Sequence, residues 1–294
     1  MSSHEHEAIG AGSAIGARPG RAMTSARKLG GKRPSRLLRI REEIPARLRL
    51  ALMVASILTP LVFWTLLEAS GVVSPIFLPS PIEVLQAGQE MFTSGELGTD
   101  TRVSVQRIAI GFGISLVISI PLGLAMGTFR SVNAFFEPMI GFVRYMPATA
   151  FVPLLLIWLG LDESPKIALI VIGTVFFNTL MMANIVWQVP SELIRVAYTL
   201  GGGSLTVFRK VIFPYALPGI IDTARVNLAA AWNLIIVAEL VAAQEGLGVR
   251  IVRAQRFLHT DEIFVVLFVI GFIGIATDLA LRTLRNRVAP WSQE

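Results

Sequence analysis

Residues 191–218 read SELIRVAYTLGGGSLTVFRKVIFPYALP, and this stretch decides how the rest of the chain is interpreted. A charged, helix-forming start is followed by three consecutive glycines at 201–203, a basic pair, and Pro214 and Pro218. Glycine permits a tight turn and proline starts or ends a helix, so the pattern predicts a helix–turn–helix. Two interpretations fit this segment: a docking element for a partner protein, or a plain surface hairpin.

Long apolar stretches surround this segment. The 294 residues are 53% apolar and 16% charged, whereas a soluble domain carries about 25% charged residues. Six stretches approach the ~20 residues that cross a bilayer. The absence of cysteine excludes disulfide scaffolds and cysteine-ligated zinc. We therefore predict an all-α membrane protein with a membrane domain over 48–294, the loop 188–215, and spans at about 49–68, 103–128, 134–160, 166–187, 216–243 and 263–284.

The positive charge lies in the N-terminal tail. Residues 1–49 hold 11 Lys and Arg against 4 Glu, whereas residues 50–294 hold 15 Lys and Arg against 16 Asp and Glu. A nucleic-acid-binding body would be basic in its folded part, so we expect no nucleic acid partner. Residues 1–47 are interpreted as a disordered basic cytoplasmic tail, solvated or touching anionic membrane lipid.

The distribution of Lys and Arg predicts the orientation in the membrane. With the N-terminus inside and six spans, the inside segments hold 18 Lys and Arg and the outside segments hold 5. This asymmetry favours both termini on the inside. The loop 244–262 runs against the rule, because it places three arginines outside.

Local signals mark helix starts and helix contacts. Ser80, with proline next and Glu83 three residues later, has the capping-box pattern and predicts a short helix over 80–92 at the outer surface. Ser164, followed by proline, predicts an N-cap for the fourth span. Gly123 and Gly127 have the spacing at which membrane helices pack closely.

Some spans contain polar side chains, which are unfavourable in lipid and usually face a cavity or a partner helix. Arg144 and Glu239 lie deepest, and Arg144 precedes Pro147 and Pro153, where we expect the helix to break. An arginine beside irregular backbone suits an anion in transit, whereas an internal Arg144–Glu239 pair is the structural alternative. We predict a translocation pathway that includes Arg144, Asn178, Asn233 and Glu239. Five charged residues nearer to the span ends are expected to be structural or to reach the interface: Arg107, Glu137, Asp222, Arg225 and Asp278.

No catalytic or nucleotide-binding motif is present. The chain lacks GxxxxGK[ST], GxSxG and HExxH, so it has no phosphate-binding loop of that kind and no familiar nucleophile or zinc motif. We expect no cofactor, no metal, and no enzymatic activity in this chain. An intramembrane enzyme is disfavoured by the same absences.

Residues 191–218 resemble the cytoplasmic EAA loop of ATP-binding-cassette (ABC) importer permeases, whose pattern is EAA, three residues, Gly, nine residues, I-x-L-P. The matching positions here are Arg195, Val196 and Ala197, then Gly201, then Val211, Phe213 and Pro214. Arg195 replaces the acidic residue of the pattern, and Glu192 lies three residues upstream.

Further segments resemble one branch of these permeases, which transports nitrate, sulfonates, taurine or bicarbonate. They include LPSPIEVL at 78–85, RYMPATAFVPLLLIWLGLDESPK at 144–166 and AWNLIIVAELVAAQEGLG at 231–248. The resemblance extends over about residues 75–291.

The resemblance implies a fold, partners and site residues. It implies the MetI-like type I importer permease architecture in a bacterial inner membrane. A second permease subunit (itself or a sister chain), two copies of an ABC ATPase and an extracytoplasmic solute-binding protein are the implied partners. The loop would couple to the ATPase through Glu192, Arg195, Ala197, Gly201, Phe208 and Pro214. The alternative function is a stand-alone channel or secondary carrier for a small anion.

Overall fold

The computed structural model describes residues 44–292, and all regular elements in that range are helical. Most of the predicted basic tail therefore lies outside the described residues. Residues Met1–Thr59 and Pro60–Glu294 form two separate units. Helix α1 (Ala46–Ala69) crosses this boundary, and the arrangement described below is that of the second unit.

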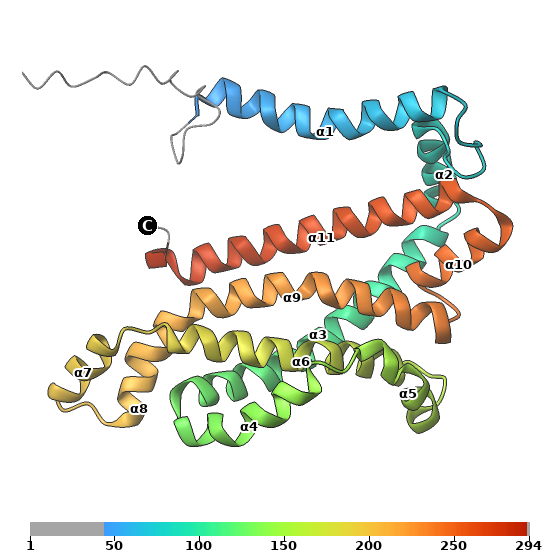
Figure 1. Ribbon diagram of the computed structural model, residues 1–294. Coiled ribbons are helices and arrows are strands. Elements are labelled where there is room, and N and C mark those ends of the chain that lie inside the picture. The colour runs from blue at the N-terminus through green and yellow to red at the C-terminus, as the bar shows by residue number, and fades with distance from the viewer. Residues whose placement is uncertain (1–43, 293–294) are drawn as a thin grey trace, which may run out of the picture. The chain divides into compact units, whose positions relative to one another are not determined.

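The second unit is a series of helices joined by short connections (Figure 1). In chain order they are α2 (Pro81–Thr93), α3 (Glu96–Thr128), α4 (Arg130–Val143), the short helix η2 (Ala148–Phe151), α5 (Val152–Leu159), α6 (Ser164–Trp187), α7 (Ser191–Thr199), α8 (Ser204–Val207), the π-helix η3 (Phe208–Ile212), α9 (Phe213–Ala242), α10 (Leu247–Phe257), α11 (Thr260–Val288) and η4 (Pro290–Ser292).

Helix α6 lies at the centre of the core, between α3 and α9. Glycines on α3 permit the close approach to α6. A Cβ atom added to Gly123 would lie 2.7 Å from the Thr179 carbonyl oxygen, and one added to Gly127 would lie 2.9 Å from the Ala183 carbonyl oxygen. The close packing predicted from the spacing of these two glycines is confirmed. A larger residue at either position would force the two helices apart.

The third apolar stretch is broken rather than straight. Helix α4 ends at Val143, and the helical segment Ala148–Leu159 leaves it at an angle of 79°. The break coincides with Pro147, whose ring cannot continue the helical hydrogen bonds. The predicted break after Arg144 is confirmed.

The segment predicted as the loop 188–215 is largely helical. Helix α7 is followed by the glycine turn, and residues Ser204–Val241 then form one continuous helical stretch. A π-helical turn, Phe208–Ile212, comes just before Pro214. Pro214 has no N–H to donate, so the α-helical hydrogen-bond ladder is interrupted at this point and a π-turn bridges the interruption. The helical stretch therefore begins at Ser204, ahead of the predicted fifth span over 216–243.

Two predicted helix starts have different outcomes. The Ser80 capping box is confirmed, because the Glu83 backbone N–H donates to the Ser80 hydroxyl and the Ser80 N–H donates to the Glu83 carboxylate. The predicted N-cap role of Ser164 is wrong. Helix α6 begins at Ser164 itself, Glu163 occupies the N-cap position, and no side chain caps the helix there.

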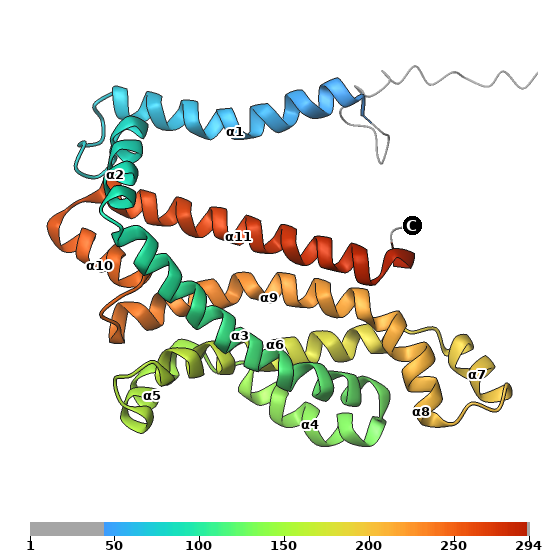
Figure 2. The same cartoon turned by 180° about the vertical axis from the view of Figure 1, so that it is seen from behind.

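The unit has two distinct ends. Helices α7 and α8 lie together at one end, and α2, α5 and α10 lie at the other (Figures 1 and 2). Five described helices are long and apolar enough to cross a membrane, and the bent pair α4–α5 makes a sixth candidate. The long helices α6, α9 and α11 connect the two ends.

Candidate functional site: the α7–α8 segment and the polar groups of the spans

Helix α7 is ended by the glycine turn. The Gly202 N–H donates to the Ala197 carbonyl at 2.9 Å, and the Gly201 N–H donates to the Tyr198 carbonyl at 2.9 Å. Gly201 has a φ of +83°, which glycine adopts without strain. A Cβ atom on Gly202 would lie 2.7 Å from the Ala197 carbonyl oxygen. The turn at 201–203 therefore requires glycine at two successive positions, for two different reasons.

One face of helix α7 packs on the protein core, and another face is exposed. Ile194 and Ala197 pack on a buried apolar cluster formed by α3, α6 and α9. Leu193 and Val196 lie on the outward side and are 46% and 55% exposed, and Leu200, next to the turn, is 82% exposed. Exposed apolar side chains at this spacing on a short helix are typical of a surface that binds a partner.

The charged side chains of α7 pair with each other at the surface. Arg195 Nη2 lies 3.0 Å from Glu192 Oε1, and both side chains are about 70% exposed, at 72% and 71%. Hydrogen bonds from its own backbone N–H and from Ser191 lower the pKa of Glu192. An exposed pair of this kind adds little to stability, so these residues are available for contacts with another protein.

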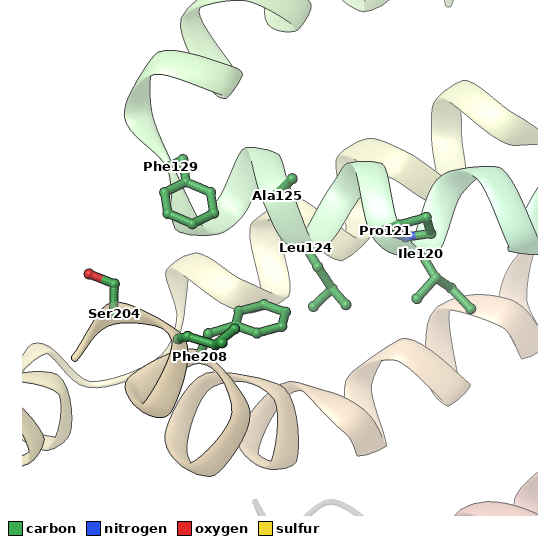
Figure 3. A pocket seen from close by; sticks show the side chains of 8 residues that line it. Ile120, Pro121, Leu124, Ala125, Phe129, Ser204 and Phe208 are labelled. Atoms are coloured by element: carbon green, nitrogen blue, oxygen red, sulfur yellow. The ribbon is translucent and has the colours of Figure 1, made fainter. Parts of the chain in front are cut away.

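Phe208 and Pro214 connect this segment to the spans. Phe208 is half-buried against the same apolar cluster as α7. Its ring lies beside α3, where it lines a groove of about 540 Å³ with Ile120 and Leu124 (Figure 3). Pro214 stands in the first turn of α9. The α7–α8 segment thus rests directly on the C-terminal halves of α3 and α6 and on the start of α9.

The four predicted pathway residues have different surroundings. Asn178 is buried and bonded to Ser115 and to Asn227, whose amide donates to the Asn178 carbonyl oxygen at 2.8 Å. Asn233 is exposed and donates to the Ala229 carbonyl of its own helix. Within residues 44–292, no hydrogen bond joins either asparagine to Arg144 or Glu239.

Arg144 and Glu239 do not pair with each other among the described residues. Arg144 is exposed, its guanidinium donates to the phenol oxygen of its neighbour Tyr145 at 3.1 Å, and the guanidinium carbon lies 4.9 Å from the centre of that ring. Glu239 is buried, and Arg107 Nη1 donates to its Oε1 at 2.8 Å. The expectation that Arg107 serves near a span end or reaches the interface misses this partner, which is 132 residues away.

Glu239 belongs to a buried polar network at the end of the unit where α10 lies. It accepts hydrogen bonds from the Ser104 hydroxyl at 2.7 Å and from the Gly248 N–H at 2.8 Å. The Gly246 N–H donates to Asp100, and the Leu247 N–H donates to Ser104. Three successive backbone N–H groups at the start of α10 are thus bound by side chains of α3 and α9, which fixes α10 on the core.

Further ion pairs of Arg250 and Arg107 extend this network. Arg250 on α10 donates to Asp100 at 2.9 Å and to Glu96 at 2.6 Å. Arg107 also pairs with Glu163, and this hydrogen bond, together with one from Lys166, holds the pKa of Glu163 at about 2 despite partial burial. Residues 244–262, predicted as a loop with three outside arginines, are mostly α10, and Arg250 is buried.

The fold is similar to that of a chain in a solved ABC transporter structure. A solved structure described as the crystal structure of an amino acid ABC transporter with histidines aligns with a TM-score of 0.54 and 14% identity, over 69% of this chain and 96% of that chain. This likeness shows the fold alone, an all-helical arrangement shared with that chain.

Sequence comparison establishes the family. Residues 119–292 match the family described as binding-protein-dependent transport system inner membrane component, and the chain belongs to it. The chain is 36% identical over 230 residues to a probable ABC transporter permease protein of Brucella abortus (strain 2308), covering 78% of this chain and 91% of that protein. It is 33% identical to the taurine transport system permease protein TauC of Escherichia coli (strain K12) over 262 residues, covering 87% and 95%.

A third relative is the putative aliphatic sulfonates transport permease protein SsuC of Bacillus subtilis (strain 168), 30% identical over 249 residues, which cover 84% of this chain and 90% of that protein. The chain is therefore the permease subunit of an ABC importer in the inner membrane, and it is not itself the catalytic subunit. A binding-protein-dependent system implies an ATPase and a solute-binding protein as partners.

Proposed function

We propose that this permease imports an organic sulfonate such as taurine, or a related small oxyanion, and that α7 is the helix through which the ATPase drives it. The substrate class is supported by two relatives whose names specify taurine and aliphatic sulfonates, each matched over more than 80% of this chain. Two permease subunits, this chain with itself or with a sister chain, would enclose the solute path.

The outward apolar face of α7 carries the proposal for coupling. Leu193, Val196 and Leu200 are exposed on a helix whose other side rests on the core. One side of α7 packs on the core and the other side is apolar and exposed. A displacement of a partner bound to the exposed side would therefore be transmitted to the helices on which α7 packs. Helix α7 would enter a cleft of the ATPase, and closure of the two ATPase copies would shift α3, α6 and α9.

A matched pair of variants tests this role of α7. Leu193→Asp places a charge on the apolar face, whereas Thr199→Asp places the same charge on the same helix close to the polar stripe of Glu192 and Arg195. The ATPase should no longer co-purify with the Leu193→Asp chain and should remain bound to the Thr199→Asp chain. Equal recovery of the ATPase with both variants would contradict docking on this face.

The orientation and the solute path are also part of the proposal. We place α7 and α8 in the cytoplasm and α2 and α10 outside, which agrees with the overall excess of Lys and Arg on the inside, although α10 itself carries three arginines. Arg144 and Asn233 have exposed side chains and are proposed to line the path. Asn178 and Glu239 are buried within this subunit and are proposed to support the lining helices.

A further inference from the structure

Helices α2, α3 and α11 enclose an apolar groove at the end of the unit where α10 lies. It has a volume of about 670 Å³, and its lining includes Gly98 and Val105 of α3 and Phe272 and Ile273 of α11. A second apolar hollow of about 510 Å³ adjoins it and shares Phe272. We call the first hollow the α3–α11 groove. Its size is that of a small-molecule site, and its walls suit a hydrocarbon chain.

One cation stands at the rim of the α3–α11 groove. Arg102 lines the groove and is exposed, and within residues 44–292 no carboxylate forms an ion pair with it. The nearest acids on α3 are already engaged, because Glu96 and Asp100 bind Arg250 at 2.6 Å and 2.9 Å. Arg102 therefore presents an unpaired guanidinium beside an apolar hollow.

The length of α3 places Arg102 near the surface of the bilayer. A helix of 33 residues is about 50 Å long, whereas the hydrocarbon core is about 30 Å thick. Arg102 is the seventh residue of α3, directly before its apolar stretch. An unpaired arginine is unfavourable in hydrocarbon but well placed at the depth of lipid phosphates. A cation at that depth, with an apolar groove beside it, complements the two parts of a phospholipid.

We propose that the α3–α11 groove binds an acyl chain of a bilayer phospholipid whose phosphate accepts hydrogen bonds from Arg102. The open space beside Gly98, where an added Cβ atom would meet nothing within 4 Å, leaves room for the chain. In the orientation given under Proposed function the lipid belongs to the outer leaflet. The site itself depends only on the membrane location of the chain, so it stands or falls independently of the transported solute.

Native mass spectrometry of the purified full-length chain with added phosphatidylglycerol tests the site. Arg102→Gln removes the charge, and Gly98→Leu fills the groove without touching the charge. Arg102→Gln should weaken the tightest lipid-binding step by about fivefold, as expected for the loss of one charge–phosphate contact. Gly98→Leu should weaken the same step because its side chain occupies the space of the acyl chain. The matched controls are Arg253→Gln, an exposed arginine on α10, and Gly113→Leu, a position on α3 that is also open.

Two results would overturn the site. One is unchanged lipid binding in both Arg102→Gln and Gly98→Leu, with thermal unfolding showing that the variants are folded. The other is efficient disulfide formation between two copies carrying Gly98→Cys in native membranes, which would show that a second chain covers the groove. Because the chain has no native cysteine, a disulfide between two copies can form only through the introduced Cys at position 98.

Discussion

Arg107 Nη1 lies 2.8 Å from Glu239 Oε1, and both side chains are buried between α3 and α9. The same glutamate holds the Gly248 N–H at the start of α10. A Cβ atom on Gly246 would lie 2.5 Å from the Glu239 carboxyl carbon, so this glycine makes room for the carboxylate. One ion pair thus joins two spans and the α10 segment that follows them.

Removing one partner of this ion pair should be far more damaging than removing both. Arg107→Met leaves the Glu239 carboxylate buried without its cation and is expected to lower the free energy of unfolding by about 3 kcal/mol or more. The double variant Arg107→Met with Glu239→Gln should recover most of that loss, because no uncompensated charge remains at position 239 and the amide oxygen can still accept from the Gly248 N–H. Thermal unfolding in detergent measures the stability of the single and the double variant.

The control for this pair is Arg253→Met, which removes an exposed arginine from α10 and should leave the unfolding temperature unchanged. If the double variant is as unstable as Arg107→Met alone, the ion pair is not the source of the loss.

The glycine turn after α7 should tolerate substitution at one position and not at another. Gly201→Val places a β-branched residue at a φ of +83°, which is unfavourable by about 1–2 kcal/mol or more, and should abolish ATP-driven uptake while the chain still inserts. Gly203→Val is the control, because Gly203 has an ordinary φ of −76° and open space around it. Normal uptake in Gly201→Val would show that the turn geometry is not needed for coupling.

The Glu163 carboxylate should make a small contribution to stability that is lost in acid. Its folded-state pKa is about 2 against an ordinary 4.5, so the contribution is complete above about pH 4.5 and disappears as the pH falls towards 2. The side chain is 56% exposed, which keeps the effect small.

The unfolding temperature between pH 6 and pH 3, compared in the wild type and Glu163→Gln, isolates this contribution from those of other carboxylates. The gap between the two proteins should narrow as the pH falls. A gap that stays constant over this range would contradict the role of the Arg107–Glu163 pair.

The proposed orientation predicts which cysteines react from which side. In a chain without native cysteine, Ser204→Cys next to the glycine turn should react with a membrane-impermeant maleimide only after the cytoplasmic face is opened. Gln255→Cys, at an exposed position on α10, should react with the same maleimide in intact cells. The reverse pattern would invert the topology.

Arg144 is expected to act on the solute rather than on assembly. Arg144→Gln removes an exposed cation that makes no ion pair among the described residues, so the unfolding temperature should stay unchanged. Uptake of an anionic substrate should fall about tenfold, by loss of one charge-assisted contact of about 1.5 kcal/mol. A variant that assembles poorly would identify Arg144 as structural instead.

Local features of the fold were predictable from the sequence. The capping box at Ser80, the break after Arg144 and the turn at Gly201 each depend on residues within a few positions of one another. Each feature follows from the backbone preferences of the residues in that short segment: Ser with Glu for the cap, Pro for the break and Gly for the turn. The resemblance of residues 191–218 to the EAA loop was visible for the same reason, because the EAA pattern lies within one short segment that includes α7.

The buried network was not predictable in the same way. Arg107 finds Glu239 at a separation of 132 residues and Arg250 finds Asp100 at a separation of 150. Apolar periodicity does not pair charges across the fold, so Arg107 was expected near a span end and Arg250 in an outside loop. The glycines at 246 and 248, whose missing side chains admit the Glu239 carboxylate, were the available signal.

We propose that this permease moves a small oxyanion only when the ATPase drives it. The most direct measurement is uptake of radiolabelled taurine into proteoliposomes that hold the full chain together with its co-purified ATPase and binding protein. Uptake should require ATP and the binding protein and should fall to background in Leu193→Asp. Uptake by the chain alone, without ATP, would contradict the claim and indicate a stand-alone carrier.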